Sequence, residues 1–147
     1  MNIADRKVTA QADAQAWLNS FAGTLQAGDA KTAAELFIAD GLWRDVLAFT
    51  WTIETASGRG AIAAMLAKNL ARTQPEKFHF PAKRTPPRWV NRAGQDCIEA
   101  IFEFDTAFGP CHGALRLVPD QDGRLRAWTL NSNLQELRGH EEHFKRR

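Results

Sequence analysis

The side chains best suited to chemistry stand in one aromatic run, residues 43–51, which reads Trp-Arg-Asp-Val-Leu-Ala-Phe-Thr-Trp. In an extended chain alternate residues share a face, so Asp45 shares its face with Trp43, Leu47, Phe49 and Trp51. A single carboxylate in such an apolar row is either a hydrogen-bonded structural group or the working acid of a small-molecule pocket. The run therefore predicts a one-sided cavity with Asp45 in its wall.

Two further titratable side chains, His112 and Glu103, are the candidate catalytic partners of Asp45, because each falls in a predicted strand. Other side chains that could serve as acid or donor are His79, Glu99 and Trp128. The competing interpretation is structural. Arg44 would pair with the Asp45 carboxylate, and the glutamates would pair across strands with arginines such as Arg126.

The first half of the chain has helical patterns. Residues 11–27 repeat apolar side chains every fourth position, and Gly28 ends that helix. A short helix is expected over residues 30–38, and a third helix after the Gly-Arg-Gly turn at 58–60. That turn lacks the longer glycine spacing and the lysine of phosphate-binding loops.

The second half has the alternating pattern of strands. Expected strands and turns follow in this order: short strands at 77–80 and 88–90, and long strands at 96–106, 111–119 and 124–134 with turns between them. Helices first and strands later indicate an α+β domain, a curved antiparallel sheet packed on three helices. The whole chain, residues 1–147, reads as a single domain with a polar tail from about residue 136.

Pairing the long strands through their turns gives two faces for the predicted sheet. One face carries Glu99, Ile101, Glu103, Leu115, Leu117, Trp128, Leu130 and Ser132. The other carries Ile98, Ala100, Phe102, Phe104, His112, Ala114, Arg116, Val118, Ala127 and Asn131. Because both faces are largely apolar and the helices suffice for one, we expect a homodimer through the sheet.

Composition excludes several classes of protein. A formal net charge of +2 is too small to indicate a nucleic-acid partner, and no apolar run approaches the length of a membrane helix. The first nine residues are polar and lack the apolar core of a signal peptide, so a cytoplasmic protein is expected. Two cysteines, Cys97 and Cys111, with four scattered histidines do not have the spacing of a metal site, and neither metal nor cofactor is expected.

The order of elements and residues 36–70 resemble the nuclear transport factor 2-like superfamily, with its SnoaL-like and ketosteroid-isomerase-like branches. The resemblance implies a cone-shaped domain with an internal cavity. A hydrophobic small molecule would then bind a pocket lined by Trp43, Phe49, Trp51, Ile101, Leu115, Trp128 and Leu130.

Residues 43–51 and 134–142 also resemble the N-terminal domain of flavin-containing monooxygenase-like proteins. No Gly-x-Gly-x-x-Gly motif occurs in the chain, so flavin chemistry does not carry over. The resemblance implies an accessory domain, free-standing or part of a longer product, with a separate flavoprotein as a candidate partner.

In the ketosteroid-isomerase-like branch a general-base aspartate follows the second helix, and Asp45 matches that position. That branch, which is also a standard example of acid–base tuning, holds its oxyanion with a tyrosine and a protonated aspartate. This chain has no tyrosine, and Ala114 or Leu115 stands near the position of the acid. The leading expectation is therefore a small-molecule-binding or accessory domain. The alternatives are a cofactor-independent isomerase, cyclase or dehydratase acting on a hydrophobic carbonyl compound, with Asp45 as general base, and a structural dimer module for a flavoprotein.

Overall fold

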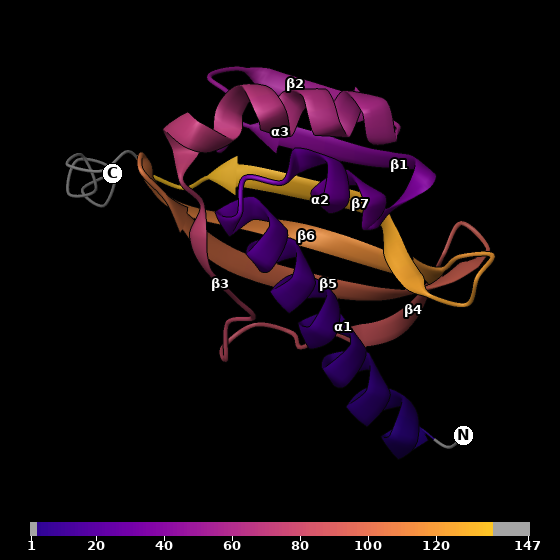
Figure 1. The fold of residues 1–147 in the computed structure, drawn as a ribbon. Coiled ribbons are helices and arrows are strands. Elements are labelled where there is room, and N and C mark those ends of the chain that lie inside the picture. The colour runs from indigo at the N-terminus through magenta and orange to yellow at the C-terminus, as the bar shows by residue number, and fades with distance from the viewer. Residues whose placement is uncertain (1–2, 137–147) are drawn as a thin grey trace.

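The computed structural model describes residues 3–136, so most of the predicted polar tail lies outside the described residues. Helices and strands follow in this order: α1 (Ile3–Gln26), α2 (Ala30–Glu35), β1 (Phe37–Val46), β2 (Ile53–Ser57), α3 (Arg59–Thr73), β3 (Glu76–His79), β4 (Arg88–Arg92), β5 (Gln95–Thr106), β6 (Gly109–Pro119) and β7 (Leu125–Leu134). The predicted α+β class with three helices is confirmed. The helices lie on one side of a curved sheet (Figure 1).

The helices attach to the sheet through one buried stripe each. On α1 the stripe includes Trp17 and Phe21, and the Trp17 indole donates a hydrogen bond to the Leu36 carbonyl at 3.0 Å. Asp29 caps α2 by accepting from the Thr32 amide at 3.1 Å. The helix predicted over 30–38 ends earlier, at Glu35, because the chain turns into β1 and buries Phe37 completely.

The sheet has seven strands in the order β2-β1-β7-β6-β5-β3, and β4 also pairs with β5. All pairs are antiparallel except β1 with β7, which run parallel. Helix α3 packs beside β1 and β2, whereas α1 packs against β3, β4 and β5. The two helices therefore divide the inner face between them (Figure 1).

The register of β5 against β6 differs by one residue from the predicted one. Ile98 pairs with Leu117 and Phe102 pairs with Gly113, which puts the two apolar rows on the same, inner face. A Cβ at Gly113 would clash with the backbone carbonyl oxygen of Asn131 and would lie 2.6 Å from Cζ of Phe102, so only glycine fits there. The predicted second apolar face is therefore wrong. The outer face carries half-buried polar residues, such as Glu99, Glu103 and Arg116, with Ile101 and Ala114 between them.

The aromatic run also differs from its prediction. β1 ends at Val46, and residues 47–52 form a loop in which Leu47 has a φ of 63°. The alternation that placed Trp51 beside Asp45 stops at this bend, and 52% of Trp51 is exposed. The loop instead turns Phe49 inward, where it is 1% exposed.

Stacked and edge-on aromatic rings occupy the space between the sheet and the helices. Phe49 lies 5.0 Å from Trp43 and 5.6 Å from Phe104, measured between ring centroids. Phe104 stacks on Phe78 at 4.7 Å, and Phe21 continues the cluster toward α1. Such pairs add to the stability gained by burying the rings. The interior of the cone is thus a packed core in this structure.

Candidate functional site

Asp45 lies in the interior, with none of its surface exposed. Its carboxylate accepts hydrogen bonds from the Phe49 amide at 3.0 Å, and from the Thr50 amide at 2.8 Å and hydroxyl at 2.9 Å. The Ser132 hydroxyl donates to the other carboxylate oxygen. Buried carboxylates persist when their lone pairs are satisfied in this way. The side chain holds the 47–52 loop against the sheet.

A second layer of contacts fixes Ser132. The Trp43 indole donates a 2.8 Å hydrogen bond to the Ser132 hydroxyl, which in turn donates to Asp45. These two hydrogen bonds therefore connect β1 to β7 and back to β1, from Trp43 through Ser132 to Asp45. Arg44, the expected partner of Asp45, is exposed on the opposite face of β1 and does not contribute.

The structure does not bring His112 and Glu103 together with Asp45. They face each other across β5 and β6 on the outer side of the sheet, and Glu103 accepts from His79 at 3.1 Å. Burial, and secondly Arg84, lower the pKa of His112. Its Nδ1 atom is buried without a hydrogen-bond partner among residues 3–136. The backbone of the sheet separates this cluster from the interior carboxylate.

The expected glutamate–arginine pairs form with different arginines. Glu99 pairs with Arg92 at 2.9 Å and Arg116 at 3.0 Å, and the hydrogen bond from Arg92 is the main reason that its pKa is lowered. Arg126, the partner named from the sequence, instead binds Asp120 and Asp122 in the β6–β7 turn.

The residues predicted to line the pocket fall into two groups. Four of them are core residues with between 0% and 2% of their surface exposed, so water does not reach them: Trp43, Phe49, Leu115 and Leu130. The other three lie elsewhere. Trp51 is exposed in its loop, Ile101 lies on the outer face because of the one-residue register change, and Trp128 is the extra residue of a bulge opposite β6.

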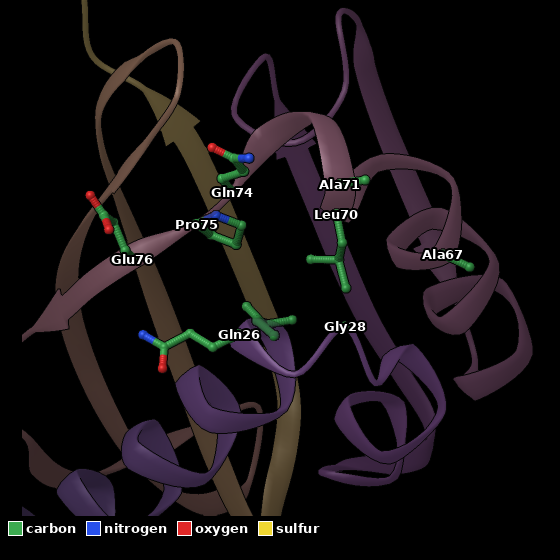
Figure 2. A pocket seen from close by; sticks show the side chains of 9 residues that line it. Gln26, Gly28, Ala67, Leu70, Ala71, Gln74, Pro75 and Glu76 are labelled. Carbon is green, nitrogen blue, oxygen red and sulfur yellow. The ribbon is translucent and has the colours of Figure 1, made fainter.

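A groove of about 660 Å³ lies between the ends of α1 and α3. We call it the α1–α3 groove. Nine residues line it: Leu25, Gln26, Gly28, Ala67, Leu70, Ala71, Gln74, Pro75 and Glu76. Figure 2 shows Leu70 projecting from α3 into this space, with Gln26, Gln74 and Glu76 around it.

The groove has an apolar floor and a polar rim. Leu25 and Leu70 are 3% and 8% exposed and pack on the aromatic core beneath. The rim side chains of Gln26, Gln74 and Glu76 are exposed and make no hydrogen bond to another described residue. An apolar base with a few free polar groups is the usual make-up of a small-molecule site.

Sequence reasoning did not find the groove residues. The sequence predicts for Gly28 only that it ends a helix. The positions of Gly28 and Pro75 mark the ends of α1 and α3, and the meeting of these two ends depends on how the helices pack. Gln74 takes the left-handed conformation (φ 45°) directly after the last turn of α3, and this marks the end of that helix.

Comparison with solved structures identifies the fold. An NTF2-like protein with a cystatin-like fold from Novosphingobium aromaticivorans has a TM-score of 0.60 and 17% identity, with 95% of this chain and 91% of that chain covered. ActVI-ORFA from Streptomyces coelicolor has a TM-score of 0.56 and 19% identity, with coverages of 84% and 96%. A protein from Catenulispora acidiphila, solved in complex with S-DNPA, has a TM-score of 0.58 and 19% identity, with coverages of 86% and 93%.

These likenesses show that the chain has the nuclear transport factor 2-like fold, as the sequence resemblance predicted. At such low identities they establish the fold alone. No protein-family model matches the sequence, and no curated protein matches it either. The closeness to flavin-containing monooxygenase-like proteins stays a prediction.

Two further findings concern membrane spans and metal sites. Within residues 3–136, no helix combines the length and apolar character needed to span a membrane. The same residues contain no group of three or more histidine, cysteine, aspartate or glutamate side chains placed to hold a metal ion.

Proposed function

We propose that the chain is a small-molecule-binding domain whose ligand occupies the α1–α3 groove. The observation that carries the proposal is the combination of the groove's size, about 660 Å³, with the free polar side chains on its rim. A cavity of this volume suits a metabolite or a drug-sized ligand. The Leu25 and Leu70 floor favours an apolar ligand body, in line with the hydrophobic ligand expected from the sequence.

A neutral fluorescent probe tests the site. N-phenyl-1-naphthylamine becomes brighter in apolar surroundings, and its emission should rise when it is titrated with the protein. Ala71→Trp fills the groove from an exposed position on α3, so it should weaken probe binding at least about tenfold while leaving the thermal midpoint nearly unchanged.

The matched control is Ala61→Trp, an exposed residue of the same helix that does not line the groove. It should bind the probe as tightly as the natural chain. Equal binding by both variants, or no binding by the natural chain, would reject the groove as the ligand site.

The enzymatic alternative, with Asp45 as general base, is a weaker proposal on this geometry. A base must reach the proton it takes, and the Asp45 carboxylate is fully buried and already accepts hydrogen bonds from Phe49, Thr50 and Ser132. Catalysis would require the 47–52 loop to open. The candidate partners His112 and Glu103 would then still lie on the other side of the sheet.

The homodimer through the sheet also remains a proposal, now supported by charge. On the outer face a basic group, Arg88, Arg92 and Arg116 around Glu99, lies on one side of Ile101, and Glu103 with Asp105 lies on the other. A two-fold rotation near Ile101 would bring opposite charges together. Sedimentation should then show a dimer that weakens at high salt, and a monomer at every salt concentration would contradict it.

Two further expectations stay at the level of proposals. A cytoplasmic location is in keeping with the free, buried thiol of Cys97, because unpaired thiols are typical of reducing compartments. A separate flavoprotein partner rests on the sequence resemblance, and co-purification with a flavin-containing protein would test it.

A further inference from the structure

The α1–α3 groove lies where two helix C-termini meet. α1 contributes Leu25 and Gln26 from its last turn, and α3 contributes Leu70 and Ala71 from the turns before its end at Thr73. The carbonyl groups at a helix C-terminus carry a partial negative charge that favours cations within the last turn. The N-terminus of α2, which begins at Ala30 close to Gly28, carries the opposite partial charge, so the negative potential in the groove comes chiefly from the end of α3.

Basic side chains do not cancel this potential. The last turn of α1 contains no basic residue. Arg72 lies in the last turn of α3, but its guanidinium donates to the Phe49 carbonyl at 3.0 Å and lies 5.8 Å from the ring of Trp51, away from the groove lining. Lys77, next along the chain, has its ammonium 4.0 Å from Asp105.

The side chains of the rim add to the same sign. Glu76 is the one charged residue among the nine that line the groove, and its carboxylate has no ion-pair partner among the described residues. Gln26 and Gln74 supply amide oxygens that can accept hydrogen bonds from an ammonium group. The floor of Leu25 and Leu70 remains apolar.

We propose that the ligand of the α1–α3 groove is a cationic amphiphile, an apolar molecule that ends in a protonated amine. The apolar body would lie on Leu25 and Leu70, and the ammonium would bind at Glu76, at the start of β3 beyond the end of α3. This inference rests on the proposed function, since it assumes that the groove binds a small molecule and adds the charge of that molecule.

Three ligands of equal chain length test the charge: octylamine, octan-1-ol and octanoate, each used to displace N-phenyl-1-naphthylamine at neutral pH. Octylamine should displace the probe at a concentration about fivefold lower than octan-1-ol, and octanoate should be the weakest, since exposed charge interactions have this size. Raising the salt concentration should shrink the difference, because the site is open to solvent.

Glu76→Gln should reduce the preference for octylamine over octan-1-ol to about twofold. The matched control is Glu54→Gln, an exposed glutamate on β2 outside the groove, which should keep the full preference. Equal displacement by octylamine and octan-1-ol, or an undiminished preference in Glu76→Gln, would overturn the inference and leave the binding site standing. Failure of the probe to bind the natural chain would overturn the proposed function and this inference together.

Discussion

The Asp45 site and the α1–α3 groove are both polar features set against the same aromatic core, and they differ in whether their polar groups have partners. Every contact of Asp45 is internal, and its carboxylate is sealed under the 47–52 loop. The rim of the groove is exposed, and the side chains of Gln26, Gln74 and Glu76 make no hydrogen bond to another described residue. A satisfied buried group stabilises the fold, whereas a free group beside an apolar floor is available to a ligand.

Replacement of the buried carboxylate should have the largest effect on stability. In Asp45→Asn an amide NH₂ group would face the Phe49 and Thr50 amides, which are themselves donors, so donors would meet donors in the interior. We expect a loss of about 3–5 kcal/mol in the free energy of unfolding. Urea denaturation measures it, and Arg44→Ala on the exposed face of β1 is the control, with a change within about 0.5 kcal/mol. A stable Asp45→Asn variant would remove the distinction between the two regions.

Ser132→Ala should be the next largest change. It removes one donor to Asp45 and leaves the Trp43 indole N–H without its acceptor. The expected loss is about 1–3 kcal/mol in the free energy of unfolding, the cost of a buried unsatisfied polar group. Probe binding at the groove should be unchanged. A loss of binding without a loss of stability would place the ligand in the interior.

Gln74→Gly should stabilise the chain by roughly 0.5–1 kcal/mol, because φ of 45° strains a residue with a Cβ and glycine adopts it freely. Gly28, on the facing side of the groove with φ of 70°, is the control, and Gly28→Ala should destabilise by a similar amount. Thermal midpoints measure both. A rim substitution that raises stability while weakening the amine ligand would sharpen the contrast with Asp45.

The smallest expected effect is a pH dependence from His112. Its pKa is lowered in the folded chain, chiefly by burial, so the unfolded chain binds the proton more readily. Stability from this residue is therefore present above its ordinary value of about 6.5 and is lost as the pH falls below it. The urea midpoint should drop between about pH 7.5 and about pH 5.5, and His112→Gln should reduce that drop. An identical drop in both chains would exclude His112 as its source.

Much of the fold could be predicted from the sequence, because the helical and strand periodicities are strong and the turns are marked by glycine and proline. The strand register could not be predicted. A shift of one residue exchanges the two faces of a strand, and when both rows of its side chains are apolar an apolar row still faces the core. Here the deciding contact is Phe102 over Gly113, a large residue opposite the smallest. Reading that pair would have placed Ile101 on the outer face.

The site shows a second limit. Asp45 stood out in the sequence because a carboxylate among aromatic residues is unusual, and the structure uses it to hold a loop. The groove residues are ordinary ones, such as Ala67 and Ala71, whose role comes from the packing of α1 beside α3. Local patterns reveal unusual residues, but a cavity made by two helix ends is a property of the tertiary structure.

The unclosed edge of the sheet at β2 has a consequence for handling the protein. Ile53 is 65% exposed there, and one side of the strand has no neighbouring strand within the described sheet. An open edge of this kind can accept a strand from another molecule, and charged side chains along it oppose such growth. Glu54 is the one charged residue of β2, so Glu54→Gln should make the protein turbid at a lower concentration than the natural chain.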